Sequence, residues 1–369
     1  MSEHAHKYYY GLTPLSSYSL VVQAALDKTW DSAIEDPLPY PRFDLHLNLN
    51  SCYPPYNSDS GWGINFENPQ WNDDTIVVLH MQDFVTVDPN HTSIELLKIQ
   101  NYYREKANRV IVLHWQYGIE KFYTGPLNLV YFPSHSWEIL NNIFKHNCIG
   151  DWERHFENPR RSKNWQCLNG CDRTHRRLLA KKLNDYNLID FSGVNSIFPT
   201  GYFSYNTLIA LPQHDYSTYS CVTNEENFLR LHPIYTDSII NIVAETQYFE
   251  EPGIITEKTI FAFMARQIPL VIGYKGIVRD LEELGFDMFR DVIDTTYDLE
   301  DNDYRISLAI KNNLHLLQEP FDAVLYEELK PRLEANFERL KGYADWCYEK
   351  LYSDLIDARI KISKDLGLV

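Results

Sequence analysis

The sequence predicts an α/β protein with two domains. Short runs rich in Val and Ile alternate with longer stretches whose apolar residues recur at helical spacing, which is typical of parallel βαβ units. The chain has 369 residues. Because domains usually contain about 100–200 residues, this length suggests two domains that each bury a core. Apolar residues make up 44% of the chain and charged residues 23%, as in ordinary globular proteins.

The first half is predicted to form one domain, at residues 1–155. The expected strands are 7–12, 43–49, 75–80, 110–115 and 127–132, and the expected helices are 16–29, 93–107 and 137–144. The polar segment 147–163 contains Asn158-Pro159 and has no periodicity, so we place the domain boundary there.

The second half resumes the alternation and is predicted to form a domain at residues 156–330. The expected strands are 165–168, 239–244 and 270–272, and the expected helices are 174–186, 257–266 and 277–284. Pro269 is expected to end a helix just before its strand, and Gly285 to supply a left-handed helix cap.

A long helix is predicted from residue 319 onward, and we assign residues 331–369 to a C-terminal helical segment. Pro331 suits a first helical turn. This helix either covers one core, which we favour, or bridges both domains. Its apolar face is expected to consist of Leu333, Phe337, Leu340, Ala344, Cys347, Leu351 and Leu355.

Net charge and cysteine usage narrow the class of protein. The formal charge of −17 argues against a protein that coats nucleic acid non-specifically, although it leaves room for a local basic groove. No apolar run approaches the ~20 residues that span a bilayer, and the amino terminus lacks the apolar core of a signal peptide. None of the six cysteines forms a Cys-x-x-Cys pair. We therefore expect a cytoplasmic protein with reduced thiols and no membrane span.

Several common catalytic motifs are missing from the sequence. It contains no Gly-x-Gly-x-x-Gly, no phosphate-binding P-loop, no His-Glu-x-x-His and no Gly-x-Ser-x-Gly. Asp301-Asn302-Asp303 matches the Asp-x-Asp pattern with which one class of sugar transferases holds a divalent metal. Because it falls in the polar run 298–305, we interpret it as a solvated acidic loop and expect no metal.

Basic residues are concentrated between positions 160 and 182, opposed only by Asp172. Three of them, Arg173, His175 and Arg176, are expected at the first turn of a helix that follows a strand, where backbone N–H groups and the helix dipole favour anions. Arginine adds a bidentate donor, so this start resembles a diphosphate grip. A solvated helix face is expected for the other helical members, Arg177, Lys181 and Lys182.

A second cluster opens the predicted helix 257–266. Thr256 can cap that helix, and Glu257 in its first turn is favoured by the dipole. Lys258 is electrostatically misplaced at a helix amino terminus unless an anion lies beside it. Glu257 accepting two ribose hydroxyls while Lys258 meets a phosphate would explain the pair, although a Glu-Lys pair alone is more often an ordinary surface feature.

These segments resemble the donor-binding domain of GT-B glycosyltransferases, most closely fucosyltransferase-like and exostosin-like enzymes and viral nucleotide-sugar transferases. The likeness covers roughly residues 165–305 and includes Asn169, although Gly170 replaces the basic residue that relatives tend to have there. Its segments are Ile239–Thr246, Ile255–Thr259, Arg266–Gly273, Gly285–Phe289, Asp294–Asp298, Leu168-Asn169 and Arg173–Arg176.

The resemblance implies a GT-B-like fold, with two Rossmann-like domains, a cleft between them and the donor in the second domain. It implies a metal-independent glycosyltransferase that needs no cofactor and uses a nucleotide-diphosphate sugar as co-substrate. The acceptor would be a glycan or a hydroxymethylated base in DNA, in the host cytoplasm if the protein is viral. The implied donor-binding residues are Asn169, Arg173, His175, Arg176, Glu245, Thr256, Glu257 and Lys258.

Two roles stay open on the sequence. Glu245 either contacts the donor sugar or caps the loop that follows it. An inverting transfer also needs a base on the acceptor side, for which Asp83, just beyond the strand 75–80, is the first candidate, although it equally suits a cap. Other candidates for the base are Glu67, Asp44, His114 and His135. The rival functions are a nucleotide-sugar epimerase or phosphorylase and a non-catalytic sugar-binding protein.

Overall fold

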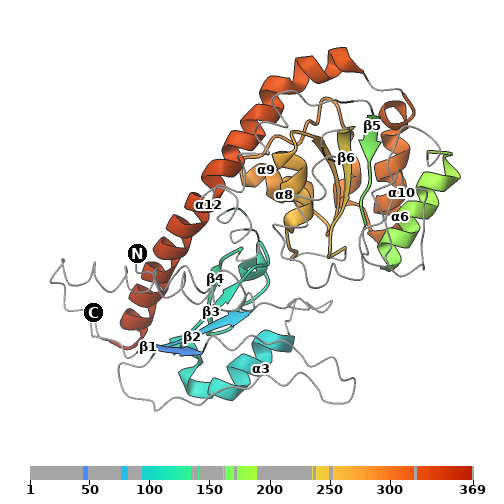
Figure 1. The fold of residues 1–369 in the computed structure, drawn as a ribbon. Helices are drawn as coiled ribbons and strands as arrows, with labels where there is room; N and C mark the ends of the chain where they lie inside the picture. The colour runs from blue at the N-terminus through green and yellow to red at the C-terminus, as the bar shows by residue number, and fades with distance from the viewer. Residues whose placement is uncertain are drawn as a thin grey trace, which may run out of the picture. The chain divides into compact units, whose positions relative to one another are not determined.

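The protein is a mixed α/β chain with parallel sheets and a long C-terminal helix (Figure 1). It divides into two compact units, of which the first comprises Met1–Glu138 with Asp345–Val369 and the second Ile139–Ala344. The computed structural model describes residues 45–48, 76–81, 94–133, 136, 140, 161, 163–169, 173–188, 235, 238–248, 252–319 and 322–367. The strand predicted at 7–12, the helix at 16–29 and most of the helix at 137–144 lie outside these ranges.

The first unit contains a four-stranded parallel sheet whose strands follow one another in chain order. The strands are β1 (Leu45–Asn48), β2 (Ile76–Met81), β3 (Val110–His114) and β4 (Asn128–Tyr131). The helix α3 (Ile94–Tyr103) continues as the 3-10 helix η1 (Arg104–Arg109), so the helix predicted at 93–107 tightens in its last part. A second 3-10 turn, η2, covers Ile119–Lys121.

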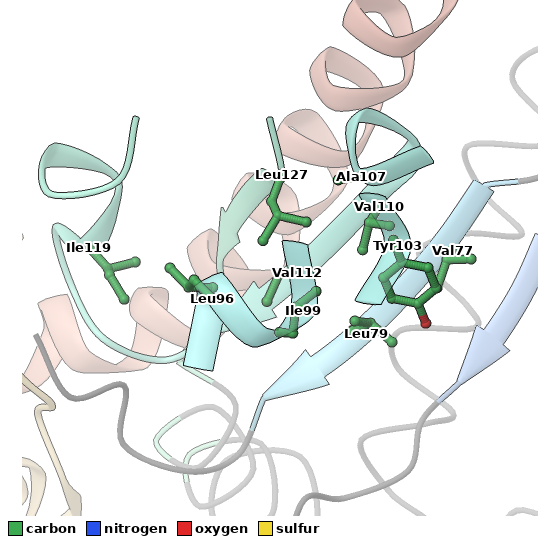
Figure 2. Close-up of a cluster of buried hydrophobic side chains, with 10 residues drawn as sticks. All are labelled: Val77, Leu79, Leu96, Ile99, Tyr103, Ala107, Val110, Val112, Ile119 and Leu127. Atoms are coloured by element: carbon green, nitrogen blue, oxygen red, sulfur yellow. The ribbon is translucent and has the colours of Figure 1, made fainter. Parts of the chain in front are cut away.

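The core of this unit forms where α3 packs on the sheet (Figure 2). Val77 and Leu79 of β2 point to the same face because side chains alternate along a strand, and Val110 and Val112 do the same in β3. The neighbouring positions on the other face, such as Val78, are buried as well. Strands that are apolar on both faces are typical of parallel sheets covered on two sides, as the Val- and Ile-rich runs predicted.

The second unit contains the three-stranded parallel sheet β5-β6-β7. Its strands are β5 (Lys163–Gln166), β6 (Ser238–Ala244) and β7 (Ile268–Ile272). Helices α8 (Glu257–Met264) and α9 (Ile277–Glu283) lie on one side of the sheet in Figure 1, and α6 (Thr174–Asp185) and α10 (Asn302–Asn312) on the other. The 3-10 helix η4 (Thr296–Leu299) precedes α10, and the short α11 (Leu314–Leu317) follows it.

Local proline rules fail at two positions in this unit. Pro269 lies inside β7, paired with Asn241, and does not merely precede the strand. A strand at the edge of the described sheet tolerates proline because one side of its backbone needs no ladder bond. Pro331 lies inside helix α12 (Ala323–Asp365), eight residues after its start and not in its first turn. Gly285 ends α9 with φ +87°, as predicted for a left-handed cap.

Helix α12 contains 43 residues, and its part up to Ala344 belongs to the second unit while its part from Asp345 belongs to the first. Every residue of the predicted apolar face, from Leu333 to Leu355, is buried. The helix continues through Pro331 because the buried apolar face and the backbone hydrogen bonds of a 43-residue helix outweigh the one N–H that proline lacks. Among the described helices, α12 included, none has a stretch long and apolar enough to cross a membrane.

Candidate functional site

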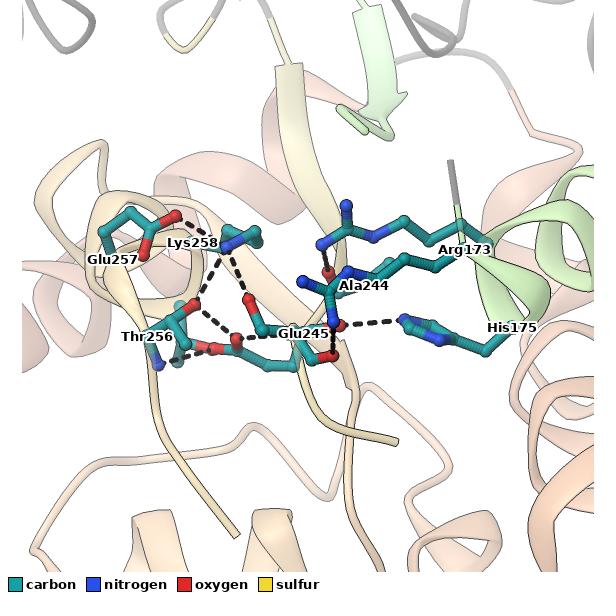
Figure 3. Close-up of polar contacts among 10 residues, drawn as sticks. Arg173, His175, Ala244, Glu245, Thr256, Glu257 and Lys258 are labelled. Carbon is teal, nitrogen blue, oxygen red and sulfur yellow. Dashed lines mark hydrogen bonds and ion pairs between the residues drawn. The ribbon is translucent and has the colours of Figure 1, made fainter. Parts of the chain in front are cut away.

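The sequence-predicted donor residues meet at the carboxyl edge of the β5-β6-β7 sheet. Because these strands are parallel, their carboxyl ends and the starts of the following helices share one edge. The starts of α6 and α8, which are 83 positions apart in the chain, contact the same short segment after β6 (Figure 3). This edge is the candidate site.

Glu245 is the central residue of this edge and is completely buried. Its Oε1 accepts hydrogen bonds from the backbone N–H of Thr256 at 3.0 Å and from Oγ1 of Thr259 at 2.6 Å. Its Oε2 accepts from the backbone N–H of Thr246 at 3.1 Å and from Oγ1 of Thr256. An ionised carboxylate offers about four acceptor positions, and the chain itself uses all of them. The sequence left two roles open for Glu245, contact with a donor sugar or capping of the following loop. These contacts are those of a residue that holds the loop after β6.

Thr256 is the N-cap residue of α8, as predicted, but its hydroxyl does not cap the helix. The backbone at Thr256 is extended, with φ −106° and ψ 179°, and no side chain hydrogen-bonds the first turn at this position. The hydroxyl donates to Glu245 instead. The loop before it is fixed by Gly253, where an added Cβ would lie 1.8 Å from the ring of Tyr274. Loop and helix start are therefore held by Glu245 and by close packing.

Two cations from different helices converge on Thr246. The guanidinium of Arg173, at the start of α6, donates to the carbonyl oxygen of Thr246 at 2.9 Å. The ammonium of Lys258, at the start of α8, donates to Oγ1 of Thr246 at 3.1 Å. Arg173 is exposed and Lys258 is partly exposed, so both reach solvent at this point. Sequence reasoning did not select Thr246, although its place directly after a predicted strand end was a usable signal.

Lys258 also contacts its neighbours in α8. Its Nζ lies 2.6 Å from Oε1 of Glu257 and 3.1 Å from Oγ1 of Thr256. The side chains of Lys258 and Glu257 are 23% and 22% exposed, so the ion pair is partly shielded from water. The misplaced cation predicted at this helix start is therefore matched by a carboxylate of the chain.

His175 is a neutral histidine at the start of α6. Its Nε2 donates to the carbonyl oxygen of Glu245 at 2.9 Å, and its ring stacks on Tyr248 with centroids 5.1 Å apart. Burial, together with the nearby charges of Arg176, Arg173 and Lys258, lowers the pKa of His175 to about 4. Burial and these three cations thus keep this imidazole uncharged at neutral pH.

Arg176 and Asn169 lie deeper at the same edge. Arg176 is buried, and its Nη2 donates to the carbonyl oxygen of Ala244 at 3.3 Å. Asn169 is buried after β5, with Nδ2 3.2 Å from Sγ of Cys167, while its Oδ1 has no hydrogen-bond partner among the described residues. Burial raises the pKa of Cys167 to about 12, so this thiol stays protonated, as expected for an inert buried cysteine.

Arg305 supports the site from α10 and was not predicted. It is completely buried, and its Nη1 donates to the carbonyl oxygens of Tyr248 at 3.0 Å and Gly273 at 2.6 Å. Its guanidinium also lies 5.1 Å from the centre of the Tyr248 ring. Arg305 therefore joins the loop after β6 to the end of β7 and fixes the ring on which His175 stacks.

The basic island of the sequence does not form one surface. Arg161 lies before β5, at the opposite end of the strand from Arg173, and it is buried. Its guanidinium donates to the carbonyl oxygens of Tyr235, Ser238, Ala265 and Arg266 at 2.5 to 3.2 Å. Arg177 and Lys181 are exposed, as predicted for a solvated helix face. Among the described residues of the island, those that belong to the candidate site are Arg173, His175 and Arg176.

Asp301 and Asp303 are exposed, as predicted for a solvated acidic segment, but this segment begins helix α10 and is not a loop. Asp301 is the N-cap residue of α10, and Asp298 and Arg305 are buried. The carboxylate of Asp298 accepts the backbone N–H groups of Val278 and Arg279, which open α9, at 3.1 and 3.2 Å. The sequence alone does not show whether a polar side chain forms its hydrogen bonds with water or with backbone groups. Within the described ranges no group of three or more His, Cys, Asp or Glu residues could hold a metal ion.

Of the candidates for the base, only His114 lies in the part of the chain that the structure describes. Asp83, Glu67, Asp44 and His135 lie outside it. His114 ends β3, and its Nδ1 donates to the carbonyl oxygen of Gln116 at 3.1 Å. Burial lowers the pKa of His114 to about 3, which makes its imidazole a poor proton acceptor at neutral pH.

Comparisons of the chain with protein-family models, with curated proteins and with solved structures gave no match. The geometry of the β5-β6-β7 edge is therefore the basis for a functional conclusion.

Proposed function

We propose that the protein is a glycosyltransferase that binds a nucleotide-diphosphate sugar at the carboxyl edge of the β5-β6-β7 sheet. The observation that carries this proposal is the convergence of Arg173 and Lys258 on Thr246, from two helix starts. In a chain with a charge of −17, two cations directed at one backbone segment beside two helix amino termini favour a polyanionic ligand. A diphosphate has the charge and the length to contact both.

The chemical role of the site follows from its donors. In a transfer the bond between the anomeric carbon and the diphosphate oxygen breaks, and the acceptor oxygen forms a new bond to that carbon. Negative charge then develops on the leaving diphosphate, where Arg173, Lys258 and the start of α8 would stabilise it without a metal. Glu257 would accept hydroxyl hydrogens of the nucleotide ribose. The proton of the acceptor hydroxyl would pass to a base in the amino-terminal half, with Asp83 as the first candidate.

The proposal extends to the arrangement of the whole enzyme. It would be GT-B-like, with two Rossmann-like domains and the donor held by the second. The acceptor would be a glycan or a hydroxymethylated base in DNA, and the reaction would take place in the cytoplasm. A comparison of turnover on hydroxymethylated DNA and on plain DNA tests whether the acceptor is the modified base or a glycan. An epimer or a sugar phosphate formed without an acceptor would instead establish the epimerase or phosphorylase.

Calorimetric titration with nucleoside diphosphates tests donor binding. Lys258→Ala and Arg173→Ala should each weaken binding about tenfold, because each removes a charged hydrogen bond to phosphate. The matched control is Lys181→Ala, since Lys181 is exposed on α6 and pairs with Asp185 away from the sheet edge. Control and unaltered protein should bind equally. Unchanged affinity in Lys258→Ala, or no binding of any nucleoside diphosphate, would overturn the proposal.

Release of free nucleotide from a panel of donor sugars tests the reaction itself. We expect one donor to be consumed above background and this turnover to be lost in Arg173→Ala. Binding without turnover on any donor would indicate the non-catalytic sugar-binding protein instead.

A further inference from the structure

The ammonium of Lys258 has no vacant donor. Its three N–H groups point to Oε1 of Glu257, Oγ1 of Thr246 and Oγ1 of Thr256. Two of these acceptors are neutral hydroxyls, and Glu257 supplies the negative charge at the shortest distance, 2.6 Å. A phosphate can therefore approach Lys258 closely only by displacing one of these acceptors.

Electric charge decides which of the three acceptors a phosphate would displace from Lys258. A phosphate brought beside Lys258 would lie within a few ångströms of the Glu257 carboxylate, and two anions at that distance repel each other. The hydroxyls of Thr246 and Thr256 carry no such penalty and are held in place from the other side, Thr256 by Glu245. Glu257 is 22% exposed at the surface of α8, so part of its side chain borders solvent.

We propose that the Glu257 carboxylate occupies, in the free protein, the position of a ligand phosphate on Lys258, and thereby makes the site select against bare phosphate. This inference rests on the proposed function. An inorganic phosphate or diphosphate that displaces Glu257 takes the ammonium from this carboxylate and, when fully ionised, offers it no hydrogen-bond donor in return. A phosphate ester that also carries neighbouring hydroxyls gives Glu257 new hydrogen-bond donors. The exchange then favours a ligand with a polyol beside its phosphate, such as a ribonucleoside diphosphate.

Three ligands and one substitution test the exchange by calorimetric titration of the full chain. The ligands are inorganic diphosphate, the ribonucleoside diphosphate that binds most tightly, and its 2′,3′-dideoxy counterpart. Glu257→Gln keeps the shape of the side chain and removes its charge. We expect inorganic diphosphate and the dideoxy ligand to bind about fivefold more tightly to the variant, the scale of a partly exposed ion pair. The ribonucleoside diphosphate should lose its advantage over the dideoxy form.

The matched control is Glu338→Gln, which removes the carboxylate of another Glu–Lys pair, 2.9 Å from Lys341 on α12. It should leave all three affinities unchanged. Equal weakening of all three ligands by Glu257→Gln, or a dideoxy ligand that binds the unaltered protein as tightly as the ribose form, would overturn this inference while leaving the proposed function intact. Failure of all three ligands to bind the unaltered protein would overturn both.

Discussion

Helices α8 and α9 follow neighbouring strands of one sheet, yet their starts are built in opposite ways. At α9 the chain supplies its own anion, because the carboxylate of Asp298 accepts the backbone N–H groups of Val278 and Arg279. At α8 the N-cap hydroxyl of Thr256 is turned to Glu245, and the first turn carries Lys258. A carboxylate on the N–H groups within the first turn, as at α9, leaves little to offer an external anion, whereas at α8 the carboxylates of Glu245 and Glu257 contact the N-cap residue and Lys258. The difference therefore distinguishes a structural helix start from a candidate binding site.

The largest expected effect comes from breaking the support of the α8 start. Glu245→Gln replaces an oxygen by an NH2 group that faces donors, so at least two hydrogen bonds become unfavourable contacts. We expect unfolding in urea, followed by tryptophan fluorescence, to show a loss of about 3–4 kcal/mol. Glu334→Gln removes a carboxylate that is 40% exposed and paired with Arg266, and should cost at most about 1 kcal/mol. Similar losses in both variants would contradict the role of Glu245.

A somewhat smaller effect is expected from His175, which lies among the cations of the candidate site. Its folded pKa of about 4 lies below the ordinary value of 6.5, so between these values the unfolded chain binds more protons. The stability that neutral His175 contributes is complete above pH 6.5 and is lost as pH falls towards 4. In urea unfolding at pH 7 and pH 4, the unaltered protein should lose about 3 kcal/mol more than His175→Gln. An equal loss of unfolding free energy in the unaltered protein and in His175→Gln between pH 7 and pH 4 would refute this prediction.

The start of α9 should show the opposite pH dependence. Burial raises the pKa of Asp298 from 3.8 to about 6, although the backbone N–H groups of Val278 and Arg279 favour its charged form. The stability of the protonated folded state is complete below pH 3.8 and is lost as pH rises through 6. Relative to Asp298→Asn, the unaltered protein should therefore lose about 2 kcal/mol between these values. An advantage of the unaltered protein over Asp298→Asn that shrinks as pH falls would instead show that Asp298 stays charged in the fold.

The sequence predicted those features that depend on local patterns. The Val- and Ile-rich runs located β2, β3 and β6, and the buried face of α12 followed from its spacing. The Thr-Glu-Lys start of α8 was found because a cation at that position is unusual. Pro331 shows the limit of local rules, since burial of a long apolar face outweighs one missing N–H.

Contacts between distant residues could not be predicted. Asp298 and Arg305 stand in a run of polar residues, and their carbonyl and N–H partners are up to 57 positions away. Polarity alone does not reveal whether such a side chain faces water or backbone. The same holds for Thr246, whose role depends on Arg173 and Lys258 approaching from two helices.

Arg161 has a consequence for how the second unit folds. The carbonyl oxygens that it contacts belong to residues 74 to 105 positions later in the chain. Closing such long loops is slow because their conformational entropy is lost before any contact compensates for it. Once formed, the clamp ties the beginnings of β5 and β6 to the end of α8, so the sheet opens only if several segments separate together. The end of the sheet opposite the candidate site should thus exchange its amide hydrogens last.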